Sequence, residues 1–342
     1  MPAPTETPSL ILARPERDAV ALVTRPLAAV GPGEVLVRIR KAGICGTDLH
    51  IIGWNAWAQR AYKPPLALGH ELCAEVMEAA PDTGFSPGER VSAETHLACG
   101  RCAQCRMDRG HTCENLTTFT RLGLGAFASF AVIPAALLRR VPEGVSDRVG
   151  AAMEPLGIAI RAVETAGRAV AALMVSGCGP IGLFAVAAAR AMTGARIVAV
   201  DPSPARRRLA AVAGADVTCA PGDLSDLPPC DAVIETSGVE AALAAAFDGT
   251  RKGGRVVYCG LPSTSLPVDI TGQIVLREVA LVGIYGRHLT RTWEEMSRLL
   301  TDGGLDITPL LAQEFPITRF ADALALARGG DSGKVLFDLT AP

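Results

Sequence analysis

Apolar and polar residues alternate along several short runs in the first 153 residues. Val35–Arg40 alternates most regularly, Glu71–Ala79 and Phe127–Ile133 are further apolar-rich runs, and Ser86–Glu89 is a Pro/Gly turn between two of them. Short alternating runs bounded by such turns are typical of strands, so this half predicts a compact, barrel-like β domain. The Pro/Thr-rich stretch before residue 9 is expected to be a loose tail.

From about residue 157 the pattern changes to apolar runs that alternate with helical segments. The first run is followed by an alanine-rich helix, Leu183–Met192. Strands that alternate with helices predict a doubly wound parallel sheet, since crossovers between parallel strands are right-handed. The expected strands are Ala172–Ser176, Arg196–Val200, Ala215–Thr218, Cys230–Gly238, Arg255–Gly260 and Leu281–Gly286.

The last part of the chain is expected to leave this second domain. Thr292–Leu300 and Phe320–Ala327 have the periodicity of amphipathic helices, and Lys334–Phe337 that of a strand. We therefore divide the α/β chain into a β-rich domain at 1–156, a dinucleotide-binding domain at 157–290, and a return of 291–342 to the first domain.

Composition and charge narrow the class of protein. The 342 residues are 49% hydrophobic and 20% charged, with a net charge of −2, which suits a globular enzyme and gives no electrostatic basis for nucleic-acid or anionic membrane partners. The most apolar segment, 170–192, is interrupted by glycines and a proline, so no membrane span is expected. Without a secretion signal, a cytoplasmic location is expected.

Four of the ten cysteines form the pattern Cys-x2-Cys-x2-Cys-x7-Cys within a lobe at about 96–115. Four thiolates on one loop can close tetrahedrally around one zinc ion, as in structural zinc sites. Free thiols are the weaker alternative, and the spacing does not match the ferredoxin iron–sulfur patterns. The predicted structural-zinc ligands are Cys99, Cys102, Cys105 and Cys113.

A second group of candidate ligands is spread along the first domain. Cys45 lies between glycines just after a predicted strand, His70 and Glu71 begin another strand, and Glu154 lies further on. A thiolate, an imidazole and one or two carboxylates would form the open site of a catalytic zinc. Thr47 and His50 follow Cys45 at spacings that allow a hydrogen-bonded pair leading from that site.

The second domain contains a dinucleotide-binding motif in its required context. The loop Gly177-Cys178-Gly179-Pro180-Ile181-Gly182 lies between a predicted strand and a helix, and Asp201 ends the next strand. The glycines and the helix N-terminus would bind the pyrophosphate, and the Asp201 carboxylate the adenosine ribose hydroxyls. This carboxylate would repel a 2′-phosphate, so NAD is expected rather than NADP, with Arg206 along the adenine face.

These motifs together resemble the zinc-dependent medium-chain dehydrogenases, most closely their L-threonine 3-dehydrogenase branch. The resemblance covers almost the whole chain and predicts a GroES-like catalytic domain followed by a Rossmann-type domain. The residues that show it are Arg40–His50, Trp54–Trp57, Gly69–Glu71, His96, Glu154–Gly157, Gly283–Arg287 and Ser332–Val335.

The resemblance implies NAD-dependent oxidation of a secondary alcohol to a ketone, with two zinc ions per subunit and a small-molecule alcohol as substrate. It implies a catalytic zinc bound by Cys45, His70 and Glu71, with Glu154 as an exchangeable or additional ligand. Further implied roles are a proton relay through Thr47 and His50, a substrate cleft lined by His96, and a cofactor contact from Ile284 and Arg287. A homotetramer is favoured, with a dimer as the alternative.

One departure from the branch bears on the substrate. After Gly157 the chain continues Ile158-Ala159-Ile160-Arg161, where threonine dehydrogenases typically have Asn-Ala-Val-His. Three functions therefore stay open: a threonine 3-dehydrogenase, a polyol, cyclitol or amino-sugar dehydrogenase of the same family, and a zinc- and NAD-binding protein without turnover. A proton relay is of no use to a mere binding protein, which disfavours the third.

Overall fold

A computed structural model describes residues 4–262 and 264–340, which divide into two compact units. Unit 1 comprises the described residues up to Glu154, together with Leu311–Gly329 and the residues from Lys334 on. Unit 2 comprises Pro155–Leu310 and Gly330–Gly333. The return to the first domain thus begins at Leu311 and not at 291. The reason is that helix α8 (Arg291–Thr301) belongs to unit 2. Its residue Glu295 forms an ion pair with Arg168 of that unit.

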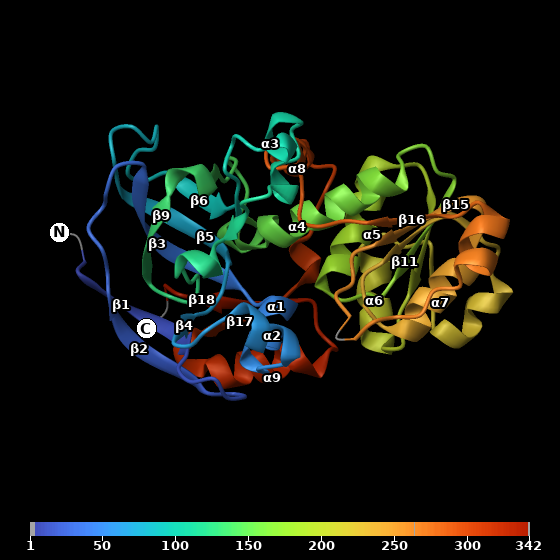
Figure 1. The fold of residues 1–342 in the computed structure, drawn as a ribbon, viewed down its shortest axis with the longest axis horizontal. Coiled ribbons are helices and arrows are strands. Elements are labelled where there is room, and N and C mark those ends of the chain that lie inside the picture. The colour runs from blue at the N-terminus through green and yellow to red at the C-terminus, as the bar shows by residue number, and fades with distance from the viewer. Residues whose placement is uncertain (1–3, 263, 341–342) are drawn as a thin grey trace. The chain divides into compact units, whose positions relative to one another are not determined.

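Unit 1 is built on a seven-stranded sheet (Figure 1). Its main path runs β10-β6-β5-β3-β18-β17, and β9 pairs with β3. The strands are β3 (Glu34–Gly43), β5 (Glu71–Ala79), β6 (Arg90–Ala93), β9 (Phe130–Pro134), β10 (Leu138–Arg140), β17 (Leu311–Pro316) and β18 (Lys334–Asp338). The C-terminal strand β18 lies beside β3, so this unit is discontinuous in sequence, as predicted.

The alternation along β3 has the expected physical basis. Val35, Val37 and Ile39 are fully buried while Arg38 is exposed, because successive side chains of a strand point to opposite faces. The same core contains Phe127 and Phe337, whose rings meet edge to face at 4.9 Å.

A smaller sheet corrects the prediction of a loose N-terminal tail. β1 (Glu6–Leu12) pairs antiparallel with β2 (Val20–Pro26) and with β4 (Leu66–Ala67). Pro8 does not interrupt β1, because its backbone faces Ser129, whose N–H donates to the Pro8 carbonyl at 3.2 Å, and so no N–H of residue 8 is needed for pairing with β2. Residues 1–3 of the predicted tail lie outside the described residues.

Unit 2 contains the expected parallel sheet, in the order β13-β12-β11-β14-β15-β16. Helices α5 and α6 cover one face and α7 the other (Figure 1). The strands are β11 (Ala172–Ser176), β12 (Arg196–Val200), β13 (Val217–Cys219), β14 (Cys230–Glu235), β15 (Thr250–Tyr258) and β16 (Ala280–Gly283), and the helices are α5 (Pro180–Met192), α6 (Pro204–Val212) and α7 (Glu240–Asp248).

The remaining helices and strands complete the two units. They are α1 (Gly46–Ile52), α2 (Ala56–Ala61), β7 (His96–Leu97), α3 (Ala103–Arg106), β8 (Thr117–Thr118), α4 (Asp147–Ala166) and α9 (Phe320–Gly329), joined by turns of 3-10 helix. Among the described residues, no helix combines the length and the apolar character that crossing a bilayer requires.

Candidate metal and dinucleotide sites

Three of the predicted catalytic ligands come together in unit 1. Cys45 is the N-cap of α1, directly after β3, and His70 and Glu71 lie where β5 begins. A sulfur of Cys45, a ring nitrogen of His70 and a carboxylate oxygen of Glu71 all lie within 4.8 Å of one another. A thiolate, an imidazole and a carboxylate at this spacing match the donor set of a zinc site. The residues therefore fit the metal.

Asp48 was not predicted from the sequence, yet it organises two of these ligands. Its carboxylate is buried and accepts hydrogen bonds from the Cys45 N–H at 3.0 Å and the Gly69 N–H at 3.2 Å. It also lies 3.4 Å from Nδ1 of His70. An imidazole held through Nδ1 by a carboxylate offers Nε2 to a metal.

These charges also affect the His70 imidazole itself. Burial opposes its protonation, but the facing Asp48 and Cys45 more than offset that, so the pKa of His70 is raised well above its ordinary value. Metals bind the neutral ring, so zinc and protons would compete for this imidazole.

Lys334 is the second residue that the sequence did not reveal. Its side chain is fully buried, and Nζ donates to the Glu71 carboxylate at 2.5 Å and to the Ile44 carbonyl at 2.9 Å. Burial disfavours the ammonium charge, but the carboxylate of Glu71 more than compensates, and the pKa of Lys334 is raised. Glu71 is thus half of a buried ion pair as well as a member of the ligand cluster.

The predicted relay residues lie on α1. Thr47 is half-buried, and its N–H points to the sulfur of Cys45 at 3.4 Å. Asn55 caps α2 by accepting the Ala58 N–H with Oδ1 at 2.9 Å, which turns its Nδ2 toward Nδ1 of His50 at 2.9 Å. Because an amide nitrogen can only donate, Nδ1 of His50 is the acceptor, and the neutral ring carries its proton on Nε2. In this state His50 can donate a hydrogen bond from Nε2, and it can take up a proton only when Nδ1 leaves the Asn55 amide.

Glu154 and His96 lie in the same unit without joining the ligand cluster. Glu154 is buried and accepts a hydrogen bond from the Thr95 hydroxyl at 2.9 Å. His96 is paired through Nδ1 with the buried carboxylate of Glu94 at 3.1 Å. The structure thus groups Glu71, and not Glu154, with Cys45 and His70.

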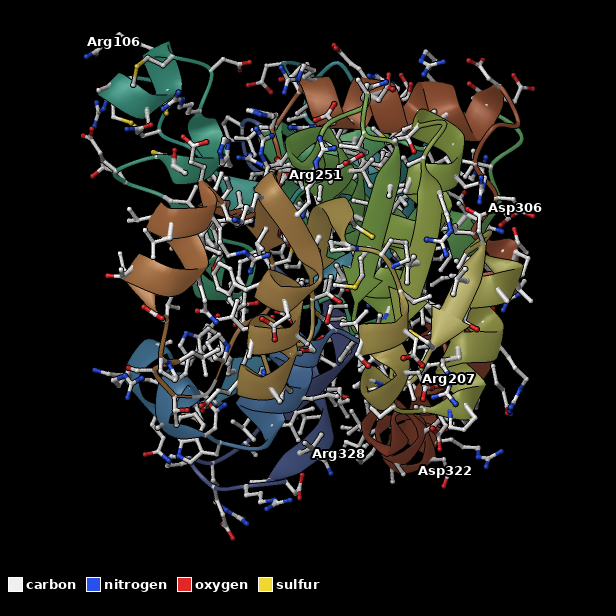
Figure 2. All side chains as sticks on the ribbon, turned by 90° about the vertical axis from the view of Figure 1, so that its right-hand side faces the viewer. Arg106, Arg207, Arg251, Asp306, Asp322 and Arg328 are labelled. Atoms are coloured by element: carbon white, nitrogen blue, oxygen red, sulfur yellow. The ribbon has the colours of Figure 1, made fainter. Side chains whose placement is uncertain are left out.

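The four-cysteine lobe brings its sulfur atoms into one cluster. All four lie within 4.8 Å of one another, and Figure 2 shows sulfur atoms of the lobe near the labelled Arg106. The Cys102–Cys105 and Cys102–Cys113 sulfur distances are 3.5 and 3.8 Å. Tetrahedral zinc with bonds of about 2.3 Å places its sulfurs ~3.8 Å apart. None of the four is in a disulfide, so all four sulfurs can bind a metal and the lobe fits a closed zinc site.

Backbone amides prepare one of these thiols for metal binding. N–H groups of Arg101 and Cys102 point at the sulfur of Cys99 and lower its pKa to about 6. A thiolate, rather than a thiol, is the form that binds zinc.

The glycine loop of unit 2 has the geometry of a dinucleotide site. Gly177 has a φ of +89°, and a Cβ on Gly182 would lie 1.8 Å from the carbonyl oxygen of Gly177. A Cβ on Gly179, the N-cap of α5, would meet nothing within 4 Å. No side chain caps α5, so no capping side chain occupies the position at its N-terminus that a pyrophosphate would take. Pro180 and Ile181 form the first turn of α5.

Asp201, which follows β12, is hydrogen-bonded to the loop that follows the neighbouring strand β11. Its buried carboxylate accepts the Cys178 N–H at 2.7 Å and the Ser203 N–H at 2.8 Å. Arg206 lies 3.8 Å from the same carboxylate and partly balances its charge. Asp201 therefore fixes the glycine loop directly, besides its predicted role toward the ribose.

The remaining predicted cofactor residues differ in their surroundings. Ile284 follows β16, and its N–H donates to the Tyr258 carbonyl at 3.1 Å. Arg287 is fully buried, lies over the Trp293 ring, and leaves no room for a Cβ at Gly157. Arg287 thus has a packing role within unit 2, and its contact with a cofactor stays a prediction.

Unit 1 contains two cysteine-containing clusters of metal ligands, and unit 2 contains a dinucleotide-binding loop. This combination is typical of a zinc-dependent dehydrogenase. Residues 31–143 match the alcohol dehydrogenase GroES-like domain and residues 180–302 the zinc-binding dehydrogenase domain. The chain belongs to the zinc-dependent alcohol dehydrogenase family, which confirms the predicted family and fold class.

The similarity to known proteins covers nearly the whole chain. It is 36% identical to the L-threonine 3-dehydrogenase of Pyrococcus furiosus, over 97% of this chain and 98% of that protein. Its structure is similar to that of L-idonate 5-dehydrogenase from Escherichia coli, with a TM-score of 0.85, 25% identity, and 97% and 98% of the two chains covered. A thermostable alcohol dehydrogenase from Pyrobaculum aerophilum gives a TM-score of 0.84, 26% identity, and 97% and 99% coverage.

Proposed function

We propose that this protein oxidises a secondary alcohol to a ketone with NAD at the cluster of Cys45, His70 and Glu71. The observation that supports it best is the position of this cluster beside α1, which also presents Thr47 and His50. A binding protein would need the ligands but not a hydroxyl and an imidazole next to them.

The residues of unit 1 can be assigned roles in this reaction. Cys45, His70 and Glu71 would hold a catalytic zinc, with Glu154 as an exchangeable or additional ligand. A zinc ion at this position would polarise the substrate hydroxyl and lower its pKa. The Thr47 hydroxyl would accept the departing proton while it releases its own. His50 would take up a proton at Nδ1 once the Asn55 amide moves away from that atom, and would then release its Nε2 proton to solvent. The four-cysteine lobe would hold a second, structural zinc.

Unit 2 would supply the hydride acceptor. The uncapped N-terminus of α5 and the crowded glycine pair Gly177 and Gly182 favour a dinucleotide pyrophosphate. The carboxylate of Asp201 favours NAD over NADP, because it would repel a 2′-phosphate. Arg206, Ile284 and Arg287 are the further cofactor contacts in this proposal.

Two substrate classes follow from the similar proteins. L-threonine is the substrate named for the Pyrococcus furiosus relative, and L-idonate for the Escherichia coli structure. We propose threonine, or a related vicinal amino alcohol, as the first candidate. Polyols, cyclitols and amino sugars are the second, because Arg161 replaces an imidazole of the threonine branch.

A panel of alcohols with NAD, followed through the absorbance of the reduced cofactor, separates these possibilities. Turnover confined to threonine would support the first candidate, and turnover confined to polyols or cyclitols the second. The variant Cys45→Ser should lose turnover while it keeps its NAD affinity, and Cys219→Ser is the matched control. Absence of turnover by the zinc-loaded protein with every alcohol would overturn the enzymatic proposal.

We further propose a cytoplasmic homo-oligomer, with a tetramer favoured over a dimer. Strand β16 lies at the edge of its sheet, and the residues near it leave large apolar side chains exposed. These are Ile270, Val275, Leu276 and Leu281, which are 57%, 60%, 71% and 38% exposed. Light scattering of the purified protein would measure the mass directly, and a monomer would overturn the proposal.

A further inference from the structure

A pocket in unit 1 is separate from both cysteine clusters. It lies between β1, β2 and the segment 123–132, and its volume is about 170 Å³. None of the candidate zinc ligands lines it. An apolar cavity of about 150 Å³ accommodates benzene, so a ligand of about that size has room here.

Arg25 provides the charge of this pocket. It lies directly across from Thr7 in the β1–β2 register, and Val23 lies across from Ser9, so these four side chains share one face of the hairpin. Arg25 is half-buried, and within the described chain it has no ion-pair partner. The residues that line the pocket include no carboxylate. A partly desolvated guanidinium without a counter-charge favours a bound anion, and its planar fork matches a carboxylate.

Apart from Arg25, Thr7 and Ser9, the side chains of the pocket wall are apolar. Leu27, Leu124, Phe130 and Val132 surround the space next to Arg25. Ser9, at the base of the hairpin face, is 1% exposed, and its hydroxyl has no hydrogen-bond partner among the described residues. One cationic group in an apolar wall suits a ligand with one anionic end and an apolar body, and does not suit inorganic phosphate or a polyol.

We propose that this pocket binds a small monocarboxylate with an apolar body. Arg25 holds the carboxylate, and the four apolar side chains enclose the body. The site contains no candidate zinc ligand and no residue of the dinucleotide loop. Its test is therefore independent of the test of the proposed activity.

Isothermal titration of the zinc-loaded full chain with benzoate tests this, with benzamide as the neutral probe of equal size. Benzoate should bind at least tenfold more tightly than benzamide. Arg25→Ala should weaken benzoate at least tenfold, whereas Arg14→Ala, which removes an exposed arginine just beyond β1, should leave it unchanged. Equal binding of the two probes, or no effect of Arg25→Ala, would overturn the proposal.

Two further variants separate binding in this pocket from binding elsewhere on the protein. Carboxylates also bind zinc, so Cys45→Ser should retain the Arg25-dependent binding, and its loss would assign benzoate to the metal cluster instead. Ala28→Trp places a large ring at an exposed position that lines the pocket, with little risk to the fold. This variant should abolish benzoate binding, and unchanged binding would place the ligand outside the pocket.

Discussion

Lys334 and Glu71 form a fully buried ion pair that reaches across a third strand. The two residues belong to β18 and β5, and β3 lies between these strands in the sheet. Gly43, the last residue of β3, permits the contact. A Cβ at Gly43 would lie 2.0 Å from an oxygen of Glu71 and 2.9 Å from Cε of Lys334. The pair thus joins the C-terminal strand to the candidate metal ligand through a position that only glycine can occupy.

Replacement of Lys334 should lower the free energy of unfolding. Lys334→Met leaves the Glu71 carboxylate buried without its counter-charge, and breaking a buried pair in this way costs about 3–5 kcal/mol. Urea unfolding followed by circular dichroism would measure the loss. The double variant Lys334→Met/Glu71→Gln removes both charges and should recover part of it. A loss below ~1 kcal/mol in the single variant would show that Glu71 finds another partner or a proton.

Gly182 offers a prediction about the cofactor. Gly182→Ala places a methyl group 1.8 Å from the Gly177 carbonyl, so the loop must move away from α5. We expect NAD affinity to fall at least tenfold, measured by quenching of tryptophan fluorescence. Gly194→Ala is the matched control, because a Cβ there meets nothing within 4 Å. Equal affinity in the two variants would show that the loop does not bind the dinucleotide.

The four-cysteine lobe should contribute to stability through its metal. Cys102→Ser removes one of four converging sulfurs, so we expect one zinc fewer per chain by atomic absorption and a lower melting temperature. Cys219→Ser changes a half-buried thiol outside the lobe and should alter neither quantity. Full zinc content in Cys102→Ser would contradict the assignment of a zinc site to this lobe.

The ligands and the folds could be predicted because each has a local pattern. Alternation revealed β3, the cysteine spacing revealed the lobe, and the glycine motif between a strand and a helix revealed the dinucleotide loop. Asp48 and Lys334 could not be found this way. Asp48 is one ordinary acidic residue of a helix, and it gains its role only when β5 brings His70 to it. Lys334 lies 263 positions from Glu71, and no local pattern marks a lysine that folding will bury.

The sequence did not predict strand β1, and it placed the return of the chain to unit 1 too early. The two errors have related reasons. The backbone of Pro8 faces Ser129 and not β2, so its lack of an N–H does not interrupt the strand, although the sequence there has the composition of a tail. Helix α8 has the same amphipathic pattern whichever unit its apolar face packs on. Its assignment depends on partners such as Arg168, which are distant in sequence.

Asp338 predicts a dependence of stability on pH. Burial raises the pKa of its carboxyl, but hydrogen bonds from Thr340 and the ammonium of Lys41 at 3.0 Å outweigh this, and the pKa is lowered below its ordinary value of 3.8. A lowered pKa stabilises the folded protein above the unfolded-state value, and this stability is lost as the pH falls through the folded-state value. Asp338→Asn should therefore cost on the order of 1 kcal/mol at pH 7 and less at pH 3. A cost that does not shrink in acid, by urea unfolding, would contradict the assignment.

We expect the choice between the two nicotinamide cofactors to depend on Asp201. Its carboxylate holds the Cys178 and Ser203 amides and carries the charge that a 2′-phosphate would meet. Asp201→Ala should weaken NAD more than NADP, because NAD loses its ribose acceptor while NADP is relieved of repulsion. Asp201→Asn keeps an acceptor for one amide and should separate the charge from the loss of the loop contact. Asp226→Ala, an exposed change in the same unit, should alter neither affinity in parallel titrations. An equal loss of both cofactors in Asp201→Asn would mean that Asp201 acts on the loop alone and that cofactor choice is set by another residue.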